Sequence, residues 1–235
     1  MRKRFLSLAL VLAAGLAAAP PFAPAPAQRK AAPRDWTRTV VATPEGGFRM
    51  GNPAARVKLI EYGSLTCPHC ANFARAGMAP LKAAYVRSGR VSFEYRSLVL
   101  NGVDVTATLL ARCAGPAGFF RVVENMYATQ PAWLGRATGL TEAQRRDIQA
   151  LPEGQRYGRV ADLAGLTQLA AQHGVPARQG KACLANRAAF DRLGRLAQAA
   201  NQIGINHTPT FLINGVEVHA HSWAELEPLI KRAGG

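Results

Sequence analysis

The sequence is poor in acidic residues, with 14 Asp and Glu against 29 Lys and Arg, which leaves a formal net charge of +15 at pH 7. Such a charge favours acidic partners, anionic membrane surfaces or nucleic acid. The arginines are nevertheless scattered along the chain, without a basic stripe that has aromatic residues interleaved. We therefore expect no nucleic-acid binding and interpret the charge as a solvated basic surface.

The apolar run near the start of the chain is shorter than the roughly 20 residues that a membrane-spanning helix needs. Basic residues at 2–4 precede this run, which covers residues 5–19 and is closed by two prolines. This is the build of a secretory signal peptide. We expect a signal peptide over residues 1–27, cleaved after Ala27, although the alanines at 17–19 would also serve. A retained membrane anchor is the less favoured alternative, so the sequence predicts a periplasmic protein.

The chain has only four cysteines. Disulfides persist outside the cytosol, so an exported chain with four cysteines is expected to form two pairs. Cys67 and Cys70 are too close together in sequence to serve as a long-range staple, which leaves Cys113 and Cys183 to form a structural disulfide. The sequence also lacks a second CxxC and any HxxxH pair, so we expect no metal site.

The order of expected elements predicts an α/β fold. Residues 56–62 and 91–100 indicate strands on either side of a helical pattern that runs from the CPHC motif to about residue 86, which makes a βαβ unit. Helical spacing dominates residues 105–200, with no internal repeat. Further expected elements are a first strand over 36–42, a hairpin over 210–219 with Asn214-Gly215 as its turn, and a final helix over 222–233 with Ser222 and Glu225 in a capping box.

The CPHC motif places two cysteines at the start of a helix. Pro68 is suited to the first helical position, so Cys67 falls at the N-cap. The backbone N–H groups of His69 and Cys70 then point toward the Cys67 sulfur, and the helix dipole favours its thiolate. We expect Cys67 to be the nucleophile and Cys70 the resolving thiol, with His69 adding a donor or a positive charge that lowers the pKa of Cys67 further.

Two other interpretations of a single CxxC are half of a zinc site and an inert structural disulfide. The zinc interpretation needs a second ligand pair, which the sequence does not supply. An inert disulfide has no need of a Pro-His interior at a junction between a strand and a helix. We therefore favour redox catalysis.

The segments LIEYGSLTCPHC (59–70) and GINHTPTFLING (204–215), together with the helical insertion between them, resemble the DsbA-like thiol oxidoreductases of the thioredoxin superfamily. The resemblance implies a thioredoxin fold with an inserted all-helical domain. It divides the chain into a thioredoxin-like first part (28–103), a helical insertion (104–202) and a thioredoxin-like second part (203–235). It also implies a cis peptide bond that faces the active-site disulfide, and Thr208-Pro209 matches that position.

The resemblance assigns further residues to the site. Glu61 stands where family members keep a buried acid beneath the disulfide, and a carboxyl there would have a raised pKa and relay a proton to or from Cys70. The alternative is a rim glutamate paired with Lys58 or another cation. Thr208 stands at the position that tunes redox potential and substrate release in this superfamily. Its hydroxyl could form a hydrogen bond with the Cys67 sulfur. His207 either adds positive potential beside Cys67 or faces solvent.

Taken together, these features predict a protein disulfide oxidase. It would donate the Cys67–Cys70 disulfide to unfolded or reduced exported polypeptides through a mixed disulfide. We expect a monomer with no cofactor beyond this disulfide, reoxidised by a membrane-bound partner. The alternatives are an isomerase or reductase that uses the same cysteines, and a non-catalytic thioredoxin-fold binder. Isomerases of this superfamily usually carry an added dimerisation domain, for which the stretch after Ala27 leaves no room.

Overall fold

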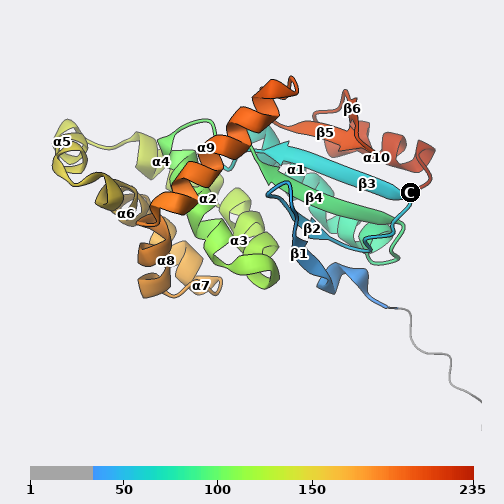
Figure 1. Cartoon of the computed structure of the whole chain (residues 1–235), viewed down its shortest axis with the longest axis horizontal. Coiled ribbons are helices and arrows are strands. Elements are labelled where there is room, and N and C mark those ends of the chain that lie inside the picture. Colours follow the sequence, from blue (N-terminus) through green and yellow to red (C-terminus); the bar gives the residue numbers. More distant parts are fainter. Residues whose placement is uncertain (1–33) are drawn as a thin grey trace, which may run out of the picture. The chain divides into compact units, whose positions relative to one another are not determined.

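Six strands form one mixed sheet (Figure 1): β1 (Val40–Ala42), β2 (Phe48–Met50), β3 (Val57–Gly63), β4 (Val91–Ser97), β5 (Thr210–Ile213) and β6 (Val216–Val218). The computed structural model describes residues 34–235. The strand order is β1-β2-β4-β3-β5-β6, with β3 and β4 parallel and every other neighbouring pair antiparallel. The central strands β3 and β4 are buried at most positions on both faces, as strands covered on two sides require.

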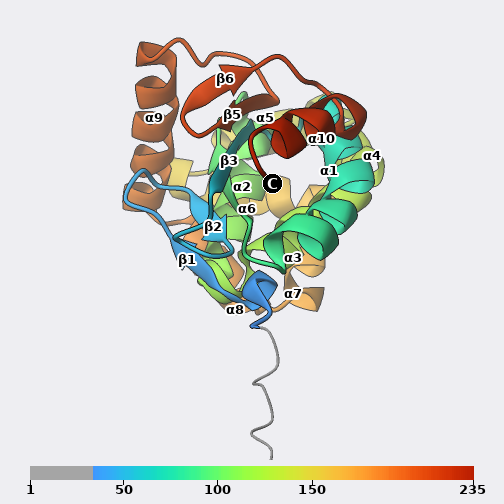
Figure 2. The ribbon, with the colours of Figure 1, turned by 90° about the vertical axis from the view of Figure 1, so that its right-hand side faces the viewer.

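Helices cover both sides of this sheet. α1 (Pro68–Pro80) follows β3 and continues into a π-helical turn, η2 (Leu81–Val86), before β4 begins, which completes the expected βαβ unit. Figure 2 shows α1 and α10 (Trp223–Arg232) on one side of the sheet and α9 (Arg187–Gln202) on the other. Phe73 of α1 packs edge-on against Phe211 of β5, with ring centroids 4.7 Å apart. Each of these fully buried rings contributes about 1.5–3 kcal/mol of hydrophobic stabilisation.

Helices dominate the chain between β4 and β5. α2 begins at Gly102 and α9 ends at Gln202, next to the domain boundaries expected from the sequence, and the division into separate domains stays a prediction. Trp133 in this block is fully buried, and its indole N–H donates to the Met126 carbonyl at 2.8 Å. Besides α9, the helices are α2 (Gly102–Cys113), α3 (Gly115–Ala128), α4 (Gln130–Thr138), α5 (Glu142–Ala150), α6 (Glu153–Ala164), α7 (Leu166–Gln172) and α8 (Ala177–Leu184).

The N-terminal part of the described chain differs from the expectation of one strand over 36–42. A 3₁₀ turn, η1 (Trp36–Arg38), comes first, because the Asp35 carboxylate accepts hydrogen bonds from the backbone N–H and the hydroxyl of Thr37. The strand is confined to β1, and β2 was not expected. The signal peptide expected over residues 1–27 lies outside the described residues. Within residues 34–235, no helix has both the length and the apolar character needed to cross a membrane.

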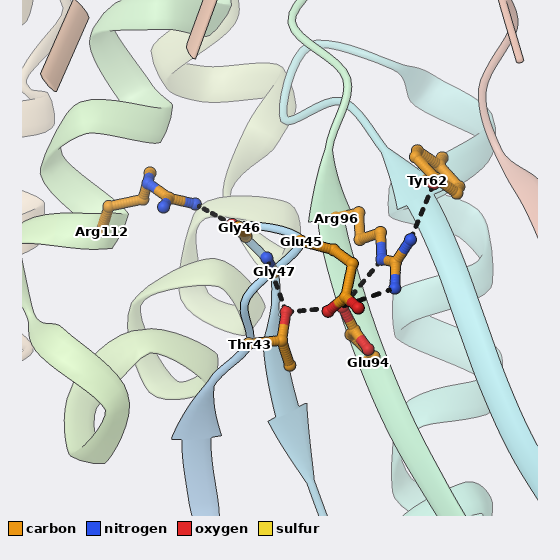
Figure 3. Close-up of polar contacts among 8 residues, drawn as sticks. All are labelled: Thr43, Glu45, Gly46, Gly47, Tyr62, Glu94, Arg96 and Arg112. Atoms are coloured by element: carbon orange, nitrogen blue, oxygen red, sulfur yellow. Dashed lines mark hydrogen bonds and ion pairs between the residues drawn. The ribbon is translucent and has the colours of Figure 1, made fainter. Parts of the chain in front are cut away.

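The β1–β2 hairpin is tied to the sheet and to the helical block by buried polar contacts (Figure 3). Glu94 of β4 accepts hydrogen bonds from the Thr43 hydroxyl at 2.8 Å and from Arg96 Nε at 2.7 Å. Arg112 of α2 donates to the carbonyl of Gly46, at 2.8 Å, in the hairpin turn. Gly46 has a φ of +84°, which glycine adopts without strain. These contacts give Glu94, Arg96 and Arg112 hydrogen-bond partners, whereas Nε of Arg49 on β2 is buried without one.

The C-terminal elements agree with the sequence except in one capping detail. Asn214 and Gly215 have φ values of +52° and +86°, as a type I′ hairpin turn requires. Ser222 caps α10 by accepting from the Glu225 N–H at 3.4 Å. The Glu225 carboxylate accepts at 2.7 Å from the N–H of His221, one residue before the expected Ser222, so the reciprocal bond of the capping box is displaced.

Candidate active site

Cys67 and Cys70 lie where β3 passes through a short loop into α1. Cys67 is the N-cap, with φ −80° and ψ 122°, and Pro68 occupies the first turn, as the sequence predicted. Cys67 is 6% exposed and Cys70 is fully buried, and both are free thiols. The backbone therefore presents one sulfur near the surface, and the helix shields the other.

The Cys67 thiol is strongly acidified by its surroundings. Its pKa falls from 9.0 to about 5, chiefly because the Cys70 thiol donates a hydrogen bond to its sulfur; the Thr208 side chain and the backbone N–H groups of Cys70 and His69 add to the effect. Burial acts in the opposite direction and is outweighed. The His69 side chain is exposed, and its contribution comes from the backbone N–H. Cys67 is therefore a thiolate at neutral pH.

Cys70 has the opposite character. Burial raises the pKa of its thiol well above the ordinary value of 9.0, and the hydrogen bond to Cys67 and the negative charges of Glu61 and Cys67 raise it further. The two cysteines therefore differ sharply at pH 7, where Cys67 is ionised and Cys70 is protonated. Such a pair combines an ionised nucleophile near the surface with a protected second thiol.

Glu61 is 2% exposed on β3, and its Oε1 atom has no hydrogen-bond partner. Burial, followed by the negative charge of Cys67, raises the pKa of this carboxyl well above 4.5. The alternative of a rim glutamate paired with Lys58 or another cation is wrong, because Glu61 is buried away from the rim and the Lys58 ammonium donates to the carbonyls of Pro53 and Ala55. A buried carboxyl of this kind can hold a proton at neutral pH and exchange it with a nearby thiol.

The loop before β5 brings Thr208 and Pro209 to the cysteines. The Thr208–Pro209 peptide bond is cis, as the family resemblance implied. The Thr208 side chain hydrogen-bonds the Cys67 sulfur, as the sequence suggested. While Cys67 is protonated, its thiol also donates to the Thr208 backbone carbonyl at 3.3 Å. His207 does not join this group: its side chain is 52% exposed, and its Nε2 atom lies 3.9 Å from the carboxylate of Glu217.

Cys113 and Cys183 lie outside this site. They form a disulfide that joins Cys113, the last residue of α2, to Cys183 within α8. Their Cα atoms are 6.0 Å apart and their sequence separation is 70. The bond joins two helices of the block between β4 and β5. It does not involve the CPHC motif.

Sequence reasoning missed three buried polar residues that contact the loop before Cys67. Asp104 is fully buried on α2, Tyr127 is 2% exposed on α3, and Gln130 is 4% exposed at the start of α4. Gln130 donates to the carbonyl of Cys67 itself at 2.9 Å. Polar residues in otherwise apolar helical segments were the available signal, but the sequence does not reveal their partners.

The chain matches a family model described as Thioredoxin over residues 43–232. Among solved structures, it is 31% identical to a protein-disulfide isomerase from Novosphingobium aromaticivorans, which it matches over 80% of its own length and 98% of that chain with a TM-score of 0.73. Wolbachia pipientis alpha-DsbA1 shares the fold, at 21% identity, 79% and 89% coverage and a TM-score of 0.63.

A relative among curated sequences comes from Rickettsia prowazekii (strain Madrid E), and its name proposes protein-disulfide oxidoreductase activity. The two chains are 25% identical over 201 residues, which is 84% of this chain and 65% of the relative. A Rickettsia felis relative with a similar name is 27% identical over 78% of this chain and 59% of its own. The chain thus spans less than two thirds of the length of these relatives.

Proposed function

The chain belongs to the thioredoxin family, among its DsbA-like thiol–disulfide oxidoreductases, and from this membership we propose that it is an oxidase which donates its Cys67–Cys70 disulfide to newly exported polypeptides. The observation that carries the proposal is the acidity of Cys67, whose pKa falls to about 5. A stabilised thiolate stabilises the reduced protein relative to the oxidised one. The disulfide is then more readily reduced and is a stronger oxidant.

The reaction proceeds in two exchanges that together move two electrons from substrate to enzyme. A substrate thiolate first attacks the Cys67 sulfur of the oxidised enzyme, which forms a mixed disulfide and releases the Cys70 thiolate. A second substrate thiolate then attacks the substrate sulfur of this bond. The substrate leaves with a new disulfide and Cys67 departs as a thiolate, a good leaving group because of its low pKa.

Glu61 supplies the proton that the first exchange requires. Cys70 leaves as a thiolate in a buried site where its pKa is raised, so the free anion is unfavourable. The Glu61 carboxyl is buried in the same region and lacks a hydrogen-bond partner at Oε1. Its raised pKa favours the protonated form, which can donate a proton. Proton transfer from Glu61 to Cys70 would neutralise the leaving thiol, and the reverse transfer would serve reoxidation.

The proposed setting is the periplasm, which the basic start and apolar run of the N-terminal sequence support. The substrates would be unfolded or reduced exported polypeptides. A membrane-bound partner would accept two electrons from the Cys67–Cys70 dithiol and regenerate the disulfide. The enzyme would act as a monomer and need no other cofactor.

Disulfide isomerisation is the second candidate, favoured by the name of the Novosphingobium aromaticivorans structure, which is 31% identical. The two functions need opposite starting states, because an oxidase acts as the disulfide and an isomerase as the dithiol. Oxidised protein should therefore introduce disulfides into a reduced, unfolded substrate protein at stoichiometric yield. Reduced protein should rearrange the same substrate with scrambled disulfides only slowly. The reverse pattern would establish the isomerase, and inactivity in both assays would establish a non-catalytic binder.

A further inference from the structure

The loop that presents Cys67 is held by buried side chains from three helices of the block between β4 and β5. Asp104 Oδ2 accepts from the Ser64 hydroxyl at 2.6 Å, and its Oδ1 accepts from the Leu65 N–H at 2.9 Å. The Tyr127 hydroxyl donates to the Ser64 carbonyl at 3.1 Å. We call Asp104, Tyr127 and Gln130 the loop clamp.

Gln130 makes the contacts that lie closest to the reacting sulfur. Its side-chain amide donates one hydrogen bond to the Leu65 carbonyl at 2.8 Å and another to the Cys67 carbonyl at 2.9 Å. A glutamine amide carries two N–H donors, so both are used on this loop. The Cys67 carbonyl also accepts from the Ala71 N–H, 3.2 Å away, in the first turn of α1. Gln130 thus fixes the peptide unit on which the Cys67 side chain stands.

The position of that peptide unit decides whether the thiolate is stabilised. The backbone N–H groups of His69 and Cys70 and the side chains of Cys70 and Thr208 lower the pKa of Cys67 only while its sulfur lies within their reach. None of these groups belongs to the helical block. A change in the direction of the Cys67 side chain would move the sulfur away from them, and its pKa would return toward that of an ordinary cysteine.

We propose that Gln130 is a positioning residue that sets the reactivity of Cys67 from the inserted helices, with Asp104 and Tyr127 holding the preceding turn. The helical insertion then has a role in the chemistry besides covering the sheet. This inference rests on the proposed thiol–disulfide chemistry of Cys67, although it holds for an oxidase and an isomerase alike. Preorganised supporting contacts of this kind hold reactive groups in their productive geometry.

The test is the titration of Cys67 in Gln130→Met, which keeps the length and apolar stem of the side chain but has no N–H donor. The rate of alkylation of reduced protein as a function of pH reports the Cys67 thiolate. We expect the midpoint to rise, and a rise of one pH unit would make alkylation at pH 5 about fivefold slower. Gln130→Glu should raise it further, because an ionised carboxylate faces the two carbonyls and adds negative charge near the sulfur.

Arg136→Met is the matched control on the same helix. Arg136 donates from Nε to the Ala164 carbonyl at 2.9 Å, a contact within the helical block, so its loss should leave the Cys67 titration unchanged. A folded Gln130→Met variant that titrates as the wild type would overturn the proposal.

If both Gln130 variants fail to fold, Tyr127→Phe decides the question, because it removes only the hydroxyl, which donates to the Ser64 carbonyl and also hydrogen-bonds the Tyr95 hydroxyl at 2.7 Å. A smaller rise of the Cys67 titration midpoint is then expected. An unchanged midpoint would overturn the proposal. The titration is independent of the oxidase assay, so failure of one does not imply failure of the other.

Discussion

In its protonated form the Cys67 thiol donates a hydrogen bond to the backbone carbonyl of Thr208 across a sequence separation of 141 residues, with 3.3 Å between sulfur and oxygen. This contact joins the loop after β3 to the loop before β5. Thr208 also acts through its side chain, which lowers the pKa of Cys67. The Cys67 thiolate is thus stabilised by a residue that lies far from the CPHC motif in sequence.

Thr208→Val should raise the pKa of Cys67. Valine keeps the branched shape of threonine and removes the hydroxyl, while the backbone carbonyl stays in place. We expect the rise to be smaller than that caused by removing Cys70, whose hydrogen bond is the largest contribution to the acidity. Thiolate absorbance of the reduced variant measures the shift, and a pKa equal to the wild-type value would show that the hydroxyl has no part in it.

Replacing the two cysteines singly should give different products. Cys70→Ala retains the nucleophile and should accumulate mixed disulfides with substrate, visible on non-reducing gels, because no second thiol resolves them. Cys67→Ala should form almost none, since Cys70 is fully buried and its pKa is raised. Equal trapping by the two variants would contradict the assignment of roles.

Glu61→Gln should stabilise the folded protein increasingly as pH rises. The folded pKa of Glu61 is raised well above 4.5, so the wild type loses stability as pH rises from the unfolded pKa through the folded one. A neutral amide escapes this loss, so the difference in unfolding free energy between the variant and the wild type should grow as pH rises. Denaturant unfolding at several pH values measures it. A difference in unfolding free energy that stays constant with pH would contradict the raised pKa.

Removing the second disulfide should affect stability alone. The Cys113–Cys183 bond closes a loop with a sequence separation of 70, so the double replacement by alanine should lower the free energy of unfolding by about 3–5 kcal/mol. Oxidase activity measured below the lower melting temperature should match the wild type. Loss of activity in a variant shown to be folded would give this disulfide a role in the chemistry.

The sequence predicts those features of the site that depend on local chemistry. A proline after Cys67 defines the helix start, whereas the buried position of Glu61 was implied by the family resemblance. β2 escaped prediction because it has three residues and is defined by pairing with β4, which lies far along the chain. The Thr208 carbonyl was missed for a related reason, since side-chain patterns do not reveal the direction of a backbone oxygen.

The loop clamp could not be predicted for a physical reason. Tyr127 and Gln130 contact the loop before Cys67 across 63 or more residues, through the packing of helices on one another. Helical periodicity indicates which residues face inward. It does not determine which backbone group each inward polar residue meets, because that depends on the angles and offsets between helices.

The equilibrium constant of the Cys67–Cys70 pair with glutathione at pH 7 tests the central claim most directly. A Cys67 pKa of about 5 favours the reduced form by about 2.7 kcal/mol over a cysteine of ordinary pKa, or about 60 mV. Relative to thioredoxin, whose potential is about −270 mV and whose reactive cysteine has a pKa of about 7, the gain is about 50 mV, so we predict a potential at or above about −220 mV. The gain in redox potential that comes from the Cys67 thiolate should shrink as pH falls to about 5, where Cys67 becomes protonated. A potential near that of thioredoxin, independent of Cys67 ionisation, would contradict the oxidase.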